Sequence, residues 1–79
     1  MYSIENEFTQ ILIFMGIPKE EIRNDASFLI DYDFDESQFI CLALYLGIFF
    51  RINVKESEYA EIDTVGGAIN FVNKKLENR

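Results

Sequence analysis

The chain has 79 residues, the length of one small domain, and 49% of them are hydrophobic, which is too apolar for a disordered chain. Fourteen acidic residues against seven basic ones give a formal charge of −7, and this excludes a nucleic-acid-binding surface because an acidic domain repels phosphates. With no histidine and a single cysteine, the chain cannot form an internal disulfide, a His–Cys zinc site, or a Ser–His or Cys–His catalytic pair.

The first predicted helix runs from about Ser3 to Met15. Ser3 is a suitable N-cap, and acidic residues in the first turn suit the positive end of the helix dipole. Gly16 followed closely by Pro18 ends the helix, because this pair is a helix stop. The apolar residues that recur at helical spacing are Ile4, Phe8, Ile11, Leu12 and Met15.

A long connection is predicted over residues 16–35. It contains a short helical turn at Pro18–Ile22, where proline occupies the favoured first position. We expect Phe28 and Leu29 to anchor this loop to the core, because they are its apolar centre.

The second long helix is predicted from about Glu36 to Arg51, with Asp35 as its N-cap. A short helical piece follows near Ser57–Glu61, and the last helix begins after Thr64. The apolar stripe of the last helix is Val65, Ala68, Ile69, Val72 and Leu76. The sequence therefore predicts a single all-α domain over residues 1–79, a small four-helix bundle with a long loop between helices one and two.

The second helix is apolar around its whole circumference. From residue 39 to residue 50, eleven of twelve residues are apolar and none is charged. At about 100° per residue, one face collects the expected core residues Phe39, Leu42, Ala43, Leu46, Phe49 and Phe50. The opposite face carries Ser37, Ile40, Cys41, Leu44 and Ile48, with Tyr45 on a flank.

Two interpretations of this opposite face remain open. A helix that is apolar on all sides is expected to be buried on all sides, and three other short elements cannot surround it. Either the long loop folds back over the face through Tyr32 or Phe34, or the face is a protein interface, formed with a second copy or with another subunit.

The chain resembles the acyl carrier protein family over nearly its whole length. The matching residues follow the family's spacing without a gap: Gly16-Ile17, Glu20-Glu21-Ile22, Asp25-Ala26-Ser27-Phe28, Asp31, Asp35, Leu42, Leu46, Phe50, Val54, Ile62, Thr64-Val65 and Ala68-Ile69. The resemblance implies the bundle described above. It also implies a serine at the start of the second helix that carries a 4′-phosphopantetheine arm, and docking on fatty acid or polyketide enzymes through that helix.

The sequence departs from the family at this serine. In the ungapped register Glu36 holds the serine position, and Ser37 lies one residue later, which is about 100° around a helix. A carboxylate does not accept the arm as a hydroxyl does. The register is set by the core residues at six, ten and fourteen positions past Glu36, namely Leu42, Leu46 and Phe50; the same offsets from Ser37 fall on Ala43, Gly47 and Arg51.

The sequence thus predicts an acyl-carrier-protein-like interaction module rather than an enzyme, with no cofactor, that docks a biosynthetic enzyme or itself. The alternative is a functional acyl carrier with phosphopantetheine on Ser37, in fatty acid or polyketide biosynthesis. The predicted partner interface is Asp35, Glu36, Ser37, Ile40, Cys41, Leu44, Tyr45 and Ile48.

No metal site is expected, because the acidic run Asp31, Asp33, Asp35 and Glu36 lacks the glycine and distal glutamate of a calcium loop. The start of the chain lacks the features of a signal peptide. The twelve-residue apolar run is shorter than the roughly 20 residues that span a bilayer. We therefore expect a cytoplasmic protein without a membrane span.

Overall fold

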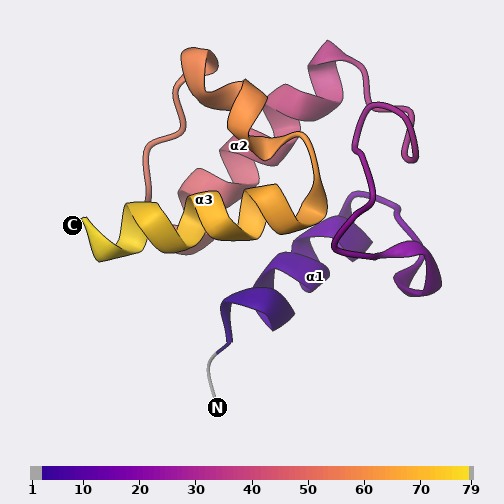
Figure 1. Cartoon of the computed structure of the whole chain (residues 1–79), viewed down its shortest axis with the longest axis horizontal. Coiled ribbons are helices and arrows are strands. Elements are labelled where there is room, and N and C mark those ends of the chain that lie inside the picture. The colour runs from indigo at the N-terminus through magenta and orange to yellow at the C-terminus, as the bar shows by residue number, and fades with distance from the viewer. Residues whose placement is uncertain (1–2, 79) are drawn as a thin grey trace.

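The computed structural model describes residues 3–78, and these form an all-α domain (Figure 1). Its elements in chain order are α1 (Ile4–Phe14), the 3-10 helix η1 (Lys19–Glu21), α2 (Glu36–Phe50), the 3-10 helix η2 (Glu56–Ile62) and α3 (Val65–Glu77). The described residues contain no strand, only an isolated β-bridge between Ser27 and Thr64. The small helical bundle with a long loop between its first two long helices is confirmed, and its third helix is of the 3-10 type. None of the helices described is long and apolar enough to cross a membrane.

Each α-helix begins at a side chain that satisfies a free backbone N–H group. Ser3 caps α1, and the Thr64 hydroxyl caps α3 by accepting a hydrogen bond of 3.0 Å. At α2 the bond is reciprocal: the Asp35 carboxylate accepts from the Gln38 N–H at 2.9 Å, and the Gln38 side chain accepts from the Asp35 N–H at 2.9 Å. This capping box places the start of α2 where the sequence predicts it.

Asp35→Ala is expected to lower the free energy of unfolding by about 1 kcal/mol, because it removes the cap acceptor and leaves an N–H of α2 unsatisfied. Urea unfolding followed by circular dichroism measures the change. Asn73→Ala, at an exposed position of α3, is the control and should have almost no effect. Equal urea midpoints for Asp35→Ala and Asn73→Ala would show that the capping box does not stabilise α2.

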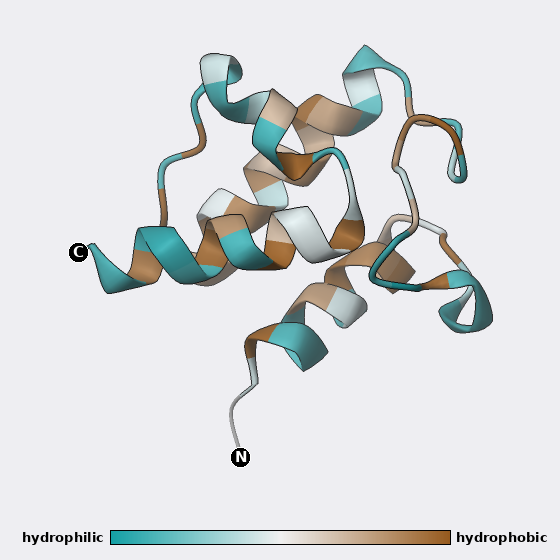
Figure 2. Ribbon diagram, viewed as in Figure 1, coloured by the Kyte–Doolittle hydropathy of each residue, from teal (hydrophilic) through white to brown (hydrophobic). Residues whose placement is uncertain are grey.

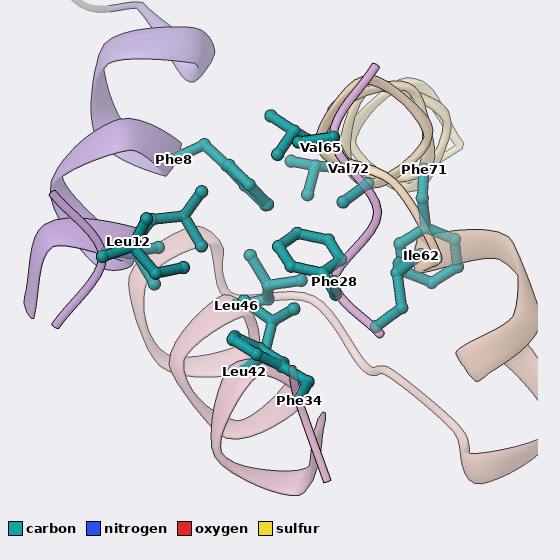
Figure 3. Packing of buried hydrophobic residues seen from close by; sticks show 14 of the residues in the cluster. Phe8, Leu12, Phe28, Phe34, Leu42, Leu46, Ile62, Val65, Phe71 and Val72 are labelled. Atoms are coloured by element: carbon teal, nitrogen blue, oxygen red, sulfur yellow. The ribbon is translucent and has the colours of Figure 1, made fainter. Parts of the chain in front are cut away.

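Phe28 is the centre of the core (Figure 3). Its side chain is fully buried, and its ring lies 5.1–6.4 Å from the rings of Phe8, Tyr32, Phe34 and Phe39. These rings come from α1, from the long loop and from α2, so one loop residue joins separate parts of the fold. The prediction that Phe28 anchors the loop is confirmed.

The same prediction is wrong for Leu29, whose side chain is 62% exposed, as Ile30 is at 82%. The chain turns here, with the Asp31 N–H donating to the Ser27 carbonyl at 2.9 Å. Since Phe28 occupies the core position, the next two side chains of the turn point to solvent. Because Phe28, Leu29 and Ile30 are all apolar, the sequence alone did not show which of them is buried.

The long loop is also tied to the start of α3 by backbone hydrogen bonds. The Phe28 N–H donates to the Asp63 carbonyl at 2.9 Å, and the Gly66 N–H donates to the Asn24 carbonyl at 2.8 Å. A Cβ atom at Gly66 would lie 3.0 Å from that carbonyl oxygen, so only glycine lets the loop approach so closely.

An ion pair joins η2 to α3. The Lys75 ammonium lies 2.8 Å from the Glu58 carboxylate, which also accepts from the Lys55 N–H at 2.9 Å. The hydrogen bond from Lys75, followed by that from Lys55, lowers the pKa of Glu58 below its ordinary value. Because the folded-state pKa is depressed, this contribution to stability is present above the unfolded-state pKa and is lost as the pH falls through the folded-state pKa.

Lys75→Met is therefore expected to raise the pKa of Glu58 toward that of an ordinary glutamate. An NMR titration of the side-chain carboxyl carbon measures the pKa in both proteins. The same Glu58 midpoint in the variant and the wild type would contradict the ion pair.

The domain is too thin to enclose α2. It measures 32 × 31 × 19 Å, and a helix with its side chains is about 10–12 Å across. Only about two layers of helix fit in the short direction, so one side of α2 lies outside the core.

Candidate protein-docking surface

The side of α2 that faces away from the core carries an outer stripe, which consists of Ile40, Leu44 and Ile48. Their side chains are 42%, 60% and 68% exposed, and Cys41 beside them is exposed as well. The spacing of four residues aligns the three side chains along the helix. Such an exposed aliphatic row needs an explanation, because large contiguous apolar patches are rare on soluble domains and often mark an interaction site.

The loop does not cover this stripe, so the first of the two interpretations is wrong. Phe34 is buried against Phe28 with ring centres 5.1 Å apart. Tyr32 packs on the same ring at 5.8 Å, and its hydroxyl donates to the Glu21 carbonyl at 2.7 Å. Burial of this phenol raises the pKa of Tyr32. Both aromatic side chains therefore face the core side of the loop.

The core face of α2 matches the prediction with one exception. Leu42, Ala43, Leu46 and Phe50 are buried, and Phe39 is partly buried. Phe49 was expected in the core, but its side chain is 46% exposed. It lies at the edge of that face, stacked on Tyr45 with ring centres 6.1 Å apart. Phe49 therefore enlarges the exposed apolar surface of α2 instead of the core.

A hollow of about 310 Å³ borders the outer stripe on one side. Its far wall is formed by the chain after α2, through Ile52, Val54 and Tyr59. Gly47 allows this chain to return closely, because a Cβ atom there would lie 3.2 Å from the Ile52 carbonyl oxygen. These wall residues were not predicted as part of the site. The only signal in the sequence is a brief alternation of apolar residues from Phe49 to Val54, which is typical of an extended segment and does not indicate where that segment packs.

A second hollow, of about 240 Å³, lies on the other flank of α2, between Phe49 and the α1 residues Ile11 and Phe14. Phe14 is exposed there. Figure 2 shows that α2 is hydrophobic over most of its length, with hydrophilic residues at its beginning. The exposed side of α2 is thus apolar from one flank to the other.

The predicted residues at the beginning of α2 border the stripe. Asp35, Glu36 and Ser37 are all exposed. Glu36 and Glu56 line a hollow of about 540 Å³ together with Ile40 and Tyr59. The Ser37 hydroxyl makes no hydrogen bond among the residues described. All eight predicted interface residues therefore lie on α2 or at its cap, seven of them exposed and Tyr45 half-buried.

Asp31, which belongs to the acidic run of the long loop, has a local role. The Asp31 carboxylate accepts from the Ser27 N–H at 2.7 Å and lies 3.9 Å from the Arg23 guanidinium. Within residues 3–78 there is no cluster of three or more histidine, cysteine or acidic side chains that could hold a metal ion. Asp31 thus closes the turn of the long loop.

The surface on α2 has an apolar centre and a polar rim, which is the usual anatomy of a protein interface. The centre is the outer stripe with its flanking hollows, and the rim is formed by Asp35, Glu36 and Glu56. This arrangement suits the binding of another protein surface. No model of a known protein family matches the sequence.

Proposed function

We propose that this domain is an acyl-carrier-protein-like interaction module that docks a partner protein, or a second copy of itself, through the outer stripe of α2. The observation that carries the proposal is the exposure of Ile40, Leu44 and Ile48 in a row that the long loop leaves uncovered. The acidic rim favours a partner with basic residues beside its own apolar contact. A single cysteine fits a reducing cytoplasmic setting for this module.

Burial of the stripe can contribute a useful part of the binding energy. Complete burial of an aliphatic side chain contributes about 1.5–3 kcal/mol. Because Ile40, Leu44 and Ile48 are already partly buried in the single chain, docking would add roughly half of that value for each of them. The stripe therefore supplies only a few kcal/mol, less than the cost of association. Further contact must come from the flanks, where Tyr59 and Phe49 border the two hollows.

The module is proposed to act without a phosphopantetheine arm. Glu36 holds the position that the resemblance assigns to the modified serine, and a carboxylate cannot form the phosphodiester. Ser37 has an exposed hydroxyl, but its direction from the helix axis differs by about 100° from that of Glu36. The residues present do not fit the arm in the expected register, so no step of the proposed function uses it.

The exposed hydroxyl of Ser37 is the observation that favours the alternative function, an acyl carrier modified at this residue. Intact mass after incubation with a phosphopantetheinyl transferase and coenzyme A separates the two functions. We expect no gain of mass in the wild type. A gain of one arm that disappears in Ser37→Ala would replace the proposed function by the carrier function.

Affinity capture tests the docking surface. The tagged wild type, Leu44→Glu and Ile30→Glu are expressed in the cells that make the protein, and the bound proteins are identified. Ile30 is the matched control, because it is an exposed aliphatic residue that lies in the long loop and not on α2. We expect the wild type and Ile30→Glu to retain the same protein, and Leu44→Glu to lose it while its helical circular dichroism is unchanged. Retention by all three would overturn the proposed surface.

A further inference from the structure

The occupant of the outer stripe can be identified more closely if the proposed docking function holds. We propose that it is a second copy of this chain, packed antiparallel on α2 about a two-fold axis that passes through Leu44. Two observations favour this partner, the spacing of residues along the stripe and the distribution of charge, and the size of the surface allows it.

The residues along the exposed side of α2 have the same spacing when they are read from either end of the helix. From Ser37 the steps are three to Ile40, four to Leu44 and four to Ile48, and the helix ends at Phe50, just before the left-handed residue Arg51. In an antiparallel pair centred on Leu44, Ile40 of one copy lies level with Ile48 of the other, and Leu44 meets Leu44. A two-fold interface requires this kind of self-complementarity, because the same patch serves both partners.

The charges also favour the antiparallel arrangement. Between residues 35 and 52 the only charged residues are Asp35 and Glu36 at the beginning of α2 and Arg51 at its end. Antiparallel packing brings the acidic end of each copy to the Arg51 end of the other. Parallel packing would instead place the acidic ends of the two copies next to each other. The antiparallel arrangement also sets opposite ends of the two helix dipoles side by side. Although each chain carries a charge of −7, the stripe itself contains no charged side chain.

The available surface is large enough only if the flanks take part. A standard interface covers about 800 Å² on each partner, which is about 15% of the 5284 Å² surface of this chain. The α2 helix of 15 residues is about 22 Å long, and packed helices lie about 8–10 Å apart. A partner helix at that separation would lie beside the hollow lined by Val54 and Tyr59 on one flank, and the stacked rings of Tyr45 and Phe49 border the other flank. The hollow of about 310 Å³ beside Leu44 gives room for the partner's side chains.

Disulfide cross-linking tests this geometry. In a Cys41→Ser background, Ile40→Cys and Ile48→Cys are made in separate chains, with Ile30→Cys as the control for random collision. Residues 40 and 48 of opposite copies lie level only in the antiparallel pair. Two copies of residue 40 would there be about 12 Å apart along the axis, and this exceeds the reach of a disulfide.

We expect rapid oxidation to give a covalent dimer only when the Ile40→Cys and Ile48→Cys chains are mixed. Cross-linking of either chain with itself at the same rate would overturn the antiparallel axis. A monomeric mass for the wild type in light scattering at about 100 µM, with no cross-link above the Ile30→Cys control, would overturn the second copy as the occupant. If the wild type is monomeric but a different protein is captured in a Leu44-dependent way, only the second copy is rejected and the proposed docking function is supported. If neither self-association nor Leu44-dependent capture is found, both proposals are refuted.

Discussion

Phe28→Ala is expected to lower the free energy of unfolding by about 3–5 kcal/mol, whereas Leu29→Ala should change it by less than about 0.5 kcal/mol. Phe28 is fully buried and its ring lies among four other aromatic rings, so its truncation leaves a large cavity. Leu29 is its exposed neighbour and loses little contact. For a domain of this size the first change is a large share of the total stability.

Urea unfolding of both variants, followed by circular dichroism, measures this difference. A shorter truncation, Phe28→Leu, keeps the comparison usable if Phe28→Ala does not fold, and it should still be clearly less stable than Leu29→Ala. Similar losses in the two alanine variants would contradict the account of the long loop, in which one residue anchors the loop and the next one does not.

Leu44→Glu is expected to weaken self-association by at least about 20-fold. Leu44 is 60% exposed in the single chain, so removing it from both copies at the proposed two-fold axis costs about 2–4 kcal/mol for the pair, and each 1.4 kcal/mol is about tenfold in the dissociation constant. It also places two carboxylates opposite each other. Because Leu44 is exposed in the single chain, the fold itself should lose less than about 0.5 kcal/mol.

Sedimentation velocity over a concentration series measures the dissociation constants. Ile30→Glu makes the same change in net charge, from −7 to −8, at an exposed residue outside α2, and should leave association unchanged. Equal weakening by both substitutions would assign the effect to overall charge repulsion and not to the stripe.

The sequence was sufficient for the features that depend on local pattern. Spacing and caps predicted the three α-helices, and Asp35 and Thr64 cap their helices as expected. The exposed row on α2 was also predictable, because a helix that is apolar all round has more apolar surface than so small a domain can cover. The predicted helical piece near Ser57–Glu61 is present as the 3-10 helix η2.

The features that depend on contacts between distant segments could not be predicted in the same way. The choice between Phe28 and Leu29 depends on how the loop turns against α1 and α2. Phe49 is exposed because α1 does not cover the edge of the core face on which it lies. The wall formed by Val54 and Tyr59 depends on the return of the chain past Gly47, and the brief apolar alternation before Val54 does not show where that segment packs.

The reactivity of Cys41 tests most directly whether the exposed side of α2 is covered in the working protein. Cys41 is the only cysteine of the chain, and it is exposed beside the outer stripe. A thiol reagent is added to native extracts that contain the wild type or Leu44→Glu, and the fraction labelled is followed by mass spectrometry. We predict slow labelling in the wild type and fast labelling in Leu44→Glu, whichever protein covers the stripe. Equally fast labelling of both would contradict the claim that α2 docks another protein surface.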